Sequence, residues 1–532
     1  MEQGLLRLIL CFFLKGIFLF TVSPLYAQEE IKFPVQKFVV IGDNPLSEKD
    51  VDKFFAEYEN TQQDISGLQA ISEEFEKLLI KKGFNFSQVV LPPQQLKSGT
   101  ISYRVSRITL SEIKVTGNRY FSDENILASL PTLELGEVPN TQKIASNMVL
   151  AQSNPAKRLR LSFSQGFLPD TVAATVTVQD KPVDDYYFWF NNSGTDLSTD
   201  YRLGVQANHR NLWGKDHQLA LSYSFSPEDT DKVSQYGFNY SIPLYSHRGV
   251  FNFLYSDSDA DTGIIAEVFD VSGAGTVVGL GYKHSLPKQP TFEHNLNFQL
   301  LDKLLDSNIN FQGQNVGQDI RSRQIIFGYF NRYIKETLSL SSNMTFSKNL
   351  SGGSFNNDEA YAGSRVGASS RWQKVNFSGS LNYQFKKTYL GRFTFFGQYS
   401  NEPLISGEQF GLGGTLGSFG PRGFEEREVS LDRGYKFSLE LLKNLTERKM
   451  QLGVFYDYGT GTRLQPQASE TYGESLSSLG LIFRWNLGSG FRLDTQYGYI
   501  LNGFQNPLSG SQDGDSKLHV VVQYLPKWSV FK

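Results

Sequence analysis

The residues best suited to do chemistry in this 532-residue chain are one arginine and two carboxylates. Arg422 lies in the segment Gly420-Pro421-Arg422-Gly423-Phe424, within a long glycine-rich stretch. Asp457 follows in the pattern Phe455-x-Asp457-x-Gly459, and Glu440 lies between them. A guanidinium and a carboxylate form a bidentate ion pair, so the expected chemistry is a charged contact that holds a loop in place.

Other patterns fall short of known catalytic or ligand-binding arrangements. The acidic run that starts at Asp257-Ser-Asp259-Ala-Asp261 resembles a calcium loop, but Thr262 and Val268 occupy the positions that require glycine and a bidentate acid. A solvated outer loop is the better interpretation, and a weak divalent-ion site that bridges to lipopolysaccharide is the alternative. The glycines at 411–420 lack the Gly-Lys-Ser/Thr of a phosphate-binding loop. The six histidines are scattered and no nucleophile elbow is present, so we expect no enzyme activity, cofactor or metal.

Alternating hydrophobic residues predict the strands that position the arginine and the carboxylates. From Val183 to Lys532, apolar residues recur at every second position and Ser, Asn, Gln and Gly lie between them. Each strand is about ten residues long, enough to cross a bilayer when tilted. The sixteen predicted strands lie near 186–192, 201–209, 218–226, 235–243, 250–256, 276–284, 292–301, 320–332, 336–346, 375–386, 391–400, 434–444, 450–459, 476–487, 490–500 and 517–526.

The connections between these strands differ in length in a regular way. Those after even-numbered strands are short, as at 387–390, whereas those after odd-numbered strands are long, as at 257–275 and 401–433. Short turns on one rim and long loops on the other are typical of an outer-membrane barrel and disfavour a soluble sandwich. The candidate strand at Val366–Trp372 falls inside one long loop and is left out of the wall. An even strand count places both ends on the short-turn, periplasmic side.

The same alternation predicts which side chains face the lumen. The outer face of a barrel in a bilayer must be apolar, so Leu452, Val454 and Tyr456 face lipid and Asp457 points inward. Glu440 also points inward, because it alternates with Leu439 and Leu441. The final strand ends in aromatic residues, including Trp528 and Phe531, which is a usual signal for barrel assembly. An inward-folded loop that carries Arg422 is therefore expected to occlude the channel until its pairing with Asp457 breaks.

Two related modules precede the barrel. The pattern Phe38-Val-Val-Ile-Gly42 returns 75 positions later as Ile113-Lys-Val-Thr-Gly117, and each is followed by a serine suited to cap a helix, Ser47 and Ser122. Each module is predicted to contain a strand, two helices and two strands, and Gly83 to end the long helix of the first.

The overall composition and the first 27 residues indicate an ordered protein that is exported. The content of aromatic residues, 14%, excludes disorder, and a net charge of −3 argues against nucleic-acid binding. Residues 1–27 have the charged start, apolar middle and small-residue end of a signal peptide. The single cysteine, Cys11, lies within this segment, so the exported protein has no thiol.

Several motifs in this order resemble the two-partner secretion transporters of Gram-negative outer membranes, which export haemagglutinins, adhesins and haemolysins. Leu91-Pro92-Pro93-Gln94 with Gly99 resembles the end of the family's first polypeptide-transport-associated (POTRA) domain, and Asn154-Pro155 with Arg158 and Gly166 resembles the second. Asn211-Leu-Trp-Gly214 resembles the first barrel turn. Gln409-Phe-Gly-Leu-Gly-Gly414 with Arg422, Gly423 and Phe424 resembles the inward-folded loop, and Phe455, Asp457 and Gly459 resemble its partner in the lumen.

The resemblance implies a signal peptide at 1–27, POTRA domains at 28–107 and 108–181, and a sixteen-stranded barrel at 182–532 with an inward-folded loop at 401–433. Its implied partners are a large secreted exoprotein bound by the POTRA domains and outer-membrane lipid with lipopolysaccharide; the barrel is expected to be a monomer. An assembly factor that inserts other barrels is the alternative function, and a passive porin is a third.

Two features depart from the family pattern. Pro421 stands where the family usually has valine or isoleucine, which predicts a different backbone path at the end of the loop. Few residues separate Ala27 from the first strand near Pro34, so the plug helix of well-known relatives is not carried over. We therefore expect the long loop to close the barrel.

Overall fold

The computed structural model describes residues 32–526 except 96–97, 195–198, 231–232, 259–262, 266–268, 272–274, 290, 306–309, 312–313, 316–318, 416–419, 446–448, 467–469 and 505–509. The predicted signal peptide, most of the acidic run after Asp257, and the aromatics Trp528 and Phe531 lie outside these residues. The chain forms two compact units, one that ends at Arg107 and one that begins at Ile108.

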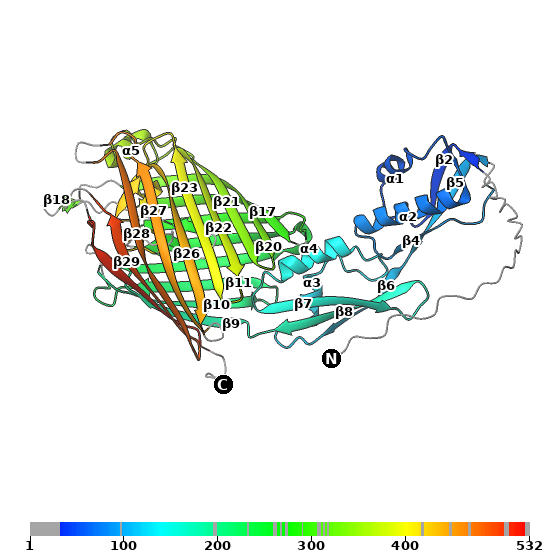
Figure 1. The fold of residues 1–532 in the computed structure, drawn as a ribbon, viewed down its shortest axis with the longest axis horizontal. Coiled ribbons are helices and arrows are strands. Elements are labelled where there is room, and N and C mark those ends of the chain that lie inside the picture. The colour runs from blue at the N-terminus through cyan, green and yellow to red at the C-terminus, as the bar shows by residue number, and fades with distance from the viewer. Residues whose placement is uncertain are drawn as a thin grey trace, which may run out of the picture. The chain divides into compact units, whose positions relative to one another are not determined.

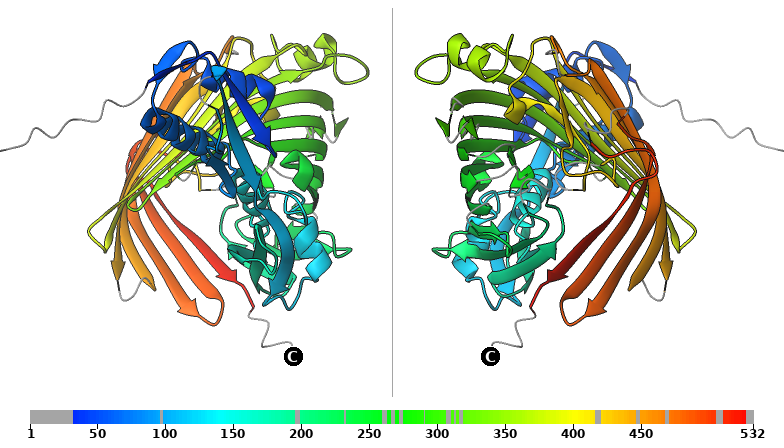
Figure 2. Two further views of the ribbon diagram at one scale, coloured as in Figure 1. Left: turned by 90° about the vertical axis from the view of Figure 1, so that its right-hand side faces the viewer. Right: turned by 90° about the vertical axis from the view of Figure 1, so that its left-hand side faces the viewer.

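Sixteen antiparallel strands form a closed barrel within the described part of the second unit (Figure 1). They are β9 (Asp184–Asn191), β10 (Arg202–Leu212), β11 (His217–Phe225), β12 (Ser234–Leu244), β13 (Gly249–Ser258), β16 (Gly275–Ser285), β17 (Phe292–Leu305), β20 (Ile320–Lys335), β21 (Leu338–Asn349), β22 (Gln373–Phe385), β23 (Tyr389–Ser400), β26 (Arg433–Leu445), β27 (Met450–Thr462), β28 (Gly473–Gly488), β29 (Phe491–Asn502) and β30 (Ser516–Tyr524). Each strand pairs with the next, and β30 pairs with β9 to close the ring that Figure 2 shows from two further directions. The predicted sixteen-stranded barrel is confirmed.

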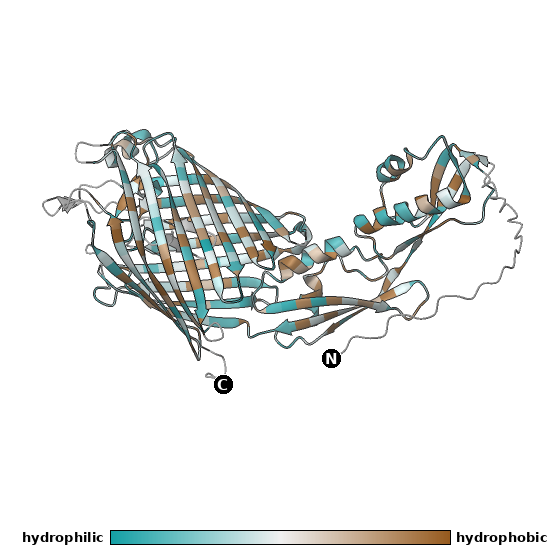
Figure 3. Cartoon of the chain, viewed as in Figure 1, coloured by the Kyte–Doolittle hydropathy of each residue, from teal (hydrophilic) through white to brown (hydrophobic). Residues whose placement is uncertain are grey.

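The strands present alternating faces, visible as alternating colours along the wall in Figure 3. On β27, Leu452 and Val454 are about half exposed on the outer face, whereas Phe455 and Asp457 are buried on the inner face. Period-2 geometry and an apolar outer surface require this arrangement.

The two rims differ as the sequence predicts. Two residues connect β20 to β21, and two connect β28 to β29. On the opposite rim, the connection after β21 contains helix α5 (Asp358–Ser364), and the connection after β23 spans 401–432. The stretch Val366–Trp372 lies in the α5 loop outside the wall, as predicted.

The first unit contains a three-stranded sheet of order β2-β5-β4, built from β2 (Lys37–Gly42), β4 (Ser87–Val90) and β5 (Thr100–Arg107). Its helices are α1 (Glu48–Phe55), which Ser47 caps as predicted, and α2 (Ile65–Lys81), which is followed by Gly83 in the left-handed region. The strand expected near Pro34 is β1 (Phe33–Val35), and it pairs with β3 (Thr61–Gln63), which was not predicted.

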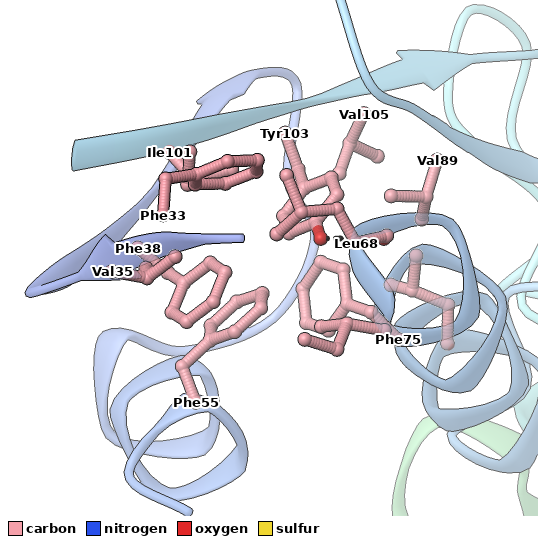
Figure 4. Packing of buried hydrophobic residues seen from close by; sticks show 12 residues of the cluster. Phe33, Val35, Phe38, Phe55, Leu68, Phe75, Val89, Ile101, Tyr103 and Val105 are labelled. Atoms are coloured by element: carbon pink, nitrogen blue, oxygen red, sulfur yellow. Dashed lines mark hydrogen bonds between the residues drawn. The ribbon is translucent and has the colours of Figure 1, made fainter. Parts of the chain in front are cut away.

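The core of this unit is aromatic (Figure 4). Phe55, Phe75 and Tyr103 lie between the helices and the sheet and are almost completely buried. The Tyr103 hydroxyl donates to the Leu68 carbonyl oxygen at 2.7 Å, and burial raises the pKa of Tyr103. The unit therefore has a hydrophobic core of its own, which is a property of an independently folding domain.

The second unit begins with a module of the same order: β6 (Thr109–Thr116), α3 (Asp123–Ala128), α4 (Thr141–Ala151), β7 (Lys157–Gln165) and β8 (Thr171–Asp180), in a sheet of order β6-β8-β7. Ser122 caps α3 as predicted. No helix among the described residues is long and apolar enough to cross a membrane.

A buried ion pair joins this module to the turn between β10 and β11. The Lys157 ammonium contacts the Asp216 carboxylate, which also accepts from the Tyr245 hydroxyl at 2.6 Å and from the Asn154 amide at 3.2 Å. Burial lowers the pKa of Lys157, and the Asp216 charge opposes this shift. Because either charge alone is costly in a buried site, the pair favours close contact between the module and the barrel turn.

Candidate functional site

The loop between β23 and β26 runs along the inner wall of the barrel, with 416–419 outside the described residues. A short hairpin, β24 (Phe410–Leu412) with β25 (Val429–Leu431), supports it. We call the described residues 413–415 and 420–428 the tip of the loop, and 401–412 together with 429–432 its root. The tip reaches side chains that point inward from β26, β27, β29 and β30.

Arg422 is the most highly bonded side chain of the tip. Its Nε and Nη2 donate to the two carboxylate oxygens of Asp457, each at 2.7 Å, which makes the bidentate pair. Nη1 donates to Glu440 at 2.9 Å and to Gln496 at 2.8 Å, and Nη2 also donates to Ser438 at 2.7 Å. All five guanidinium N–H donors therefore have an acceptor, which is what a buried arginine requires.

The barrel register brings these acceptors together. Ser438 on β26 lies directly opposite Asp457 on β27, and Glu440 lies opposite Phe455. The guanidinium carbon of Arg422 lies 3.6 Å from the centre of the Phe455 ring, a cation–π contact. Asp457 is completely buried, and its Oδ2 also accepts from the backbone N–H of Arg422 at 3.0 Å. Glu440 also pairs with Arg392 at 3.2 Å, so Arg422 belongs to a buried charge network in which Asp457 is its bidentate partner.

Glycines make room for the tip. A Cβ on Gly459 would lie 2.5 Å from a methyl of Leu412 in the root and 3.3 Å from Cδ of Pro421 in the tip, so glycine on β27 leaves room for the loop at this level. Gly423 has φ +97, a left-handed conformation that favours glycine, and a Cβ on Gly498 of β29 would lie 2.5 Å from the Gly423 nitrogen. The Gly420–Pro421 peptide bond that precedes Arg422 is cis.

The side of the tip beyond Arg422 is apolar. The Phe424 side chain is completely buried and packs edge to face on Phe504. It belongs to a cluster formed by the loop and the inner wall: Phe410, Leu412, Phe424, Val429, Leu431, Leu476, Ile500 and Phe504. The Gly423 N–H donates to Nε2 of His519 on β30 at 3.1 Å. An ion pair, a backbone hydrogen bond and apolar packing thus hold the three consecutive residues Arg422, Gly423 and Phe424 against the wall.

The structure brings together Arg422, Gly423 and Phe424 with Asp457, Phe455 and Gly459, the two sets that the sequence predicted to meet. Sequence reasoning missed four further contact residues: Ser438, Gln496, Gly498 and His519. Alternation places them on the inner face, but it does not single them out among the many other residues of that face.

The POTRA motif lies in the first unit and plays a structural part there. The Gln94 side chain donates to the Ser102 carbonyl oxygen at 2.8 Å and accepts from its N–H at 2.7 Å. It thereby continues the edge of β5 beyond the end of β4. Pro92 and Pro93 lead into this contact, and Gly99 has φ +75 at the turn that enters β5.

The acidic run places one described side chain, Asp257, against the Thr276 hydroxyl at 2.7 Å. Within the described residues, no group of three or more His, Cys, Asp or Glu side chains is arranged to hold a metal ion.

Comparison with protein families gives two matches. Residues 173–483 match the haemolysin secretion/activation protein family ShlB/FhaC/HecB, and residues 33–107 match the ShlB-type POTRA domain. The heme/hemopexin transporter protein HuxB of Haemophilus influenzae (strain 86-028NP) is 21% identical over 516 residues, which cover 93% of this chain and 87% of HuxB.

Solved structures share the fold. CdiB from Escherichia coli superposes with a TM-score of 0.72 at 18% identity and covers 95% of this chain and 93% of its own. CdiB from Acinetobacter baumannii gives 0.71 at 17% identity, over 94% and 91% of the two chains. BamA from Haemophilus ducreyi lacking POTRA domains 1–3 gives 0.52 at 14% identity, over 92% and 100%.

Proposed function

Because the chain belongs to the haemolysin secretion/activation protein family ShlB/FhaC/HecB, we propose that it passes one large, unfolded exoprotein from the periplasm to the cell surface through its barrel. The protein is an outer-membrane transporter of the two-partner secretion type, and a secreted exoprotein is its partner. The exported partner proposed here is an adhesin, a haemolysin or a related protein.

The observation that carries the proposal is the loop held inside the lumen by the ion pair of Arg422 with Asp457. A buried charged contact holds a segment firmly, because separation leaves a charge without its partner in the wall, and the contact is not covalent, so the loop can be released and held again. Arg422, Gly423 and Phe424 are proposed to keep the loop in its working position, and Phe455, Asp457 and Gly459 to receive it.

The modules are proposed to be POTRA domains at 28–107 and 108–181 that lie in the periplasm and bind the exoprotein. Their sheets end in the edge strands β2 and β4 in the first and β6 and β7 in the second. An extended polypeptide adds to such an edge through main-chain hydrogen bonds, which suits an unfolded cargo. Pro92, Pro93, Gln94 and Gly99 are proposed to maintain the edge on the β4 side.

No nucleotide is available in the periplasm, so folding of the exoprotein outside the cell is proposed to give the transport its direction. The barrel at 182–532, with its inward-folded loop at 401–433, is proposed to act as a monomer whose outer surface contacts lipid and lipopolysaccharide. No catalytic step is assigned to any residue.

Deletion of the gene tests this function. We expect one large protein to disappear from the culture medium and to accumulate or be degraded in the periplasm, with the other outer-membrane proteins unchanged. Quantitative proteomics of medium, periplasm and outer membrane measures this directly. A general loss of barrel proteins from the outer membrane would instead favour an assembly factor, and unchanged fractions would contradict both functions.

A further inference from the structure

A second buried charged site, separate from the Arg422 contact, holds the root of the loop. Glu408 lies in a short turn (Ser406–Glu408), is 1% exposed, and is surrounded by the wall. Its Oε1 lies 3.1 Å from Nζ of Lys303 on β17, and its Oε2 lies 2.8 Å from Nζ of Lys374 on β22. One carboxylate thus contacts two lysines from strands that are not neighbours.

Two amides complete this site. The Gln324 side chain on β20 donates to Oε1 of Glu408 at 2.5 Å, and the Gln398 side chain on β23 donates to its backbone carbonyl oxygen at 3.0 Å. Burial raises the pKa of Glu408, but the charges of Lys303 and Lys374 outweigh it and bring the pKa to about 2. The two lysines thus favour the ionised carboxylate, and side chains of four wall strands hold Glu408.

The other end of the root is tied to the α5 loop. Asp432, which is completely buried, forms a bidentate pair with Arg365 and accepts from the Leu404 N–H at 2.8 Å. Leu404 and Ile405 pack on Tyr361 and Trp372 of the α5 loop, all almost completely buried. Ion pairs and apolar packing therefore join the root, the wall and the α5 loop into one body.

Residues with positive φ connect the tip to this body at both of its ends. Gly413 and Gly414 follow β24 directly and have φ +110 and +85, a region that glycine enters at no steric cost. Arg427, just before β25, also has a positive φ of 49. Gly413 and Gly414 thus lie at the end of β24, at an element-terminal position of the kind where hinges absorb changes in φ and ψ.

We infer that Glu408, with Lys303 and Lys374, is a fixed seat for the loop, and that gating moves the tip about Gly413 and Gly414 while the root stays in place. Glu408 is on this account a positioning residue, which acts on transport through the loop that it holds. The inference rests on the proposed role of the loop in secretion. It predicts that breaking the tip contact leaves the root undisturbed.

Hydrogen exchange measured by mass spectrometry on the full-length protein in detergent or nanodiscs tests the seat. In Arg422→Ala, we expect amides of 420–428 to exchange at least tenfold faster than in the wild type, with those of 404–412 unchanged. In Glu408→Gln, we expect faster exchange at 404–412. The conservative variant Glu408→Asp keeps a carboxylate between Lys303 and Lys374 and is expected to retain more protection at 404–412 than Glu408→Gln. Glu359→Gln, on the exposed face of α5, is the matched control.

Faster exchange at 404–412 in Arg422→Ala would contradict the inference that the root stays in place, because the whole loop would then leave the wall. This measurement does not depend on whether Glu408→Gln folds. Failure of the secretion role is distinguishable: the exchange pattern would be as expected, but both variants would release exoprotein at the wild-type rate.

Discussion

Arg422→Ala is expected to lower the release of exoprotein at least tenfold, while the barrel still folds and reaches the outer membrane. The substitution leaves the buried Asp457 carboxylate without its bidentate cation, whereas Glu440 keeps its pair with Arg392 at 3.2 Å. Removal of one partner from a buried ion pair costs about 3–5 kcal/mol. Since about 1.4 kcal/mol changes an equilibrium tenfold, the inward position of the tip would be disfavoured by a factor on the order of a hundred or more.

Companion variants test whether loss of the ion pair causes the drop in exoprotein release. Asp457→Asn preserves the shape of the side chain but removes its charge, and Arg422→Lys preserves the charge but not the planar fork of donors. Both are expected to secrete poorly, and the double variant Arg422→Ala with Asp457→Ala to be no worse than either single change, because the two residues act as one contact. Arg371→Ala, an exposed arginine in the α5 loop, controls for loss of positive charge. Wild-type release by both Arg422→Ala and Asp457→Ala would contradict the assigned role.

Removal of Phe33–Arg107 is expected to abolish secretion and to leave a folded barrel. The segment is a compact unit with its own core, and the barrel closes through its own sixteen strands, so we expect the barrel to fold without this segment. Its β2 and β4 edges would no longer be available to the exoprotein, which we expect to accumulate in the periplasm. Immunoblots of medium and periplasm measure the defect, and the heat-dependent electrophoretic shift of folded barrels verifies folding.

An outcome that contradicts this expectation is simple to recognise. If the truncated protein released exoprotein at the wild-type rate, the first module would have no part in recognition, and a passive pore would become the better description.

A point variant within the module is expected to have a smaller effect than the truncation. Gln94→Ala removes both side-chain hydrogen bonds to Ser102 and is expected to reduce secretion only partly.

The sequence was most informative where one physical constraint acts on every residue. A strand with one face to lipid must alternate, so β27 and the inward position of Asp457 were predictable from Leu452, Val454 and Tyr456 alone. Helix caps at Ser47 and Ser122 were predictable for a similar reason, since the free N–H groups of a first turn need local acceptors.

Contacts between distant segments were not predictable in this way. Glu408 contacts Lys303, which lies 105 positions away in the sequence, and Gly423 contacts His519, which lies 96 positions away. The alternation of apolar and polar residues along each strand indicates that Lys303 and His519 point inward. Which loop residue each of them contacts depends on strand tilt, register and the path of the loop. The Arg422–Asp457 pair was the exception, because alternation placed Asp457 inward, Arg422 lay in a long glycine-rich stretch, and both motifs also resemble those of a known family.

The most direct measurement of the central claim is where the exoprotein lies during export. A photoreactive amino acid at Thr345, which faces the lumen on β21 and lies outside both charged sites, is compared with one at Met344, its lipid-facing neighbour, which is 53% exposed. The account predicts that irradiation of secreting cells joins the Thr345 variant, and not the Met344 variant, to one large secreted polypeptide. No adduct at Thr345, or equal adducts at both positions, would contradict passage through the lumen.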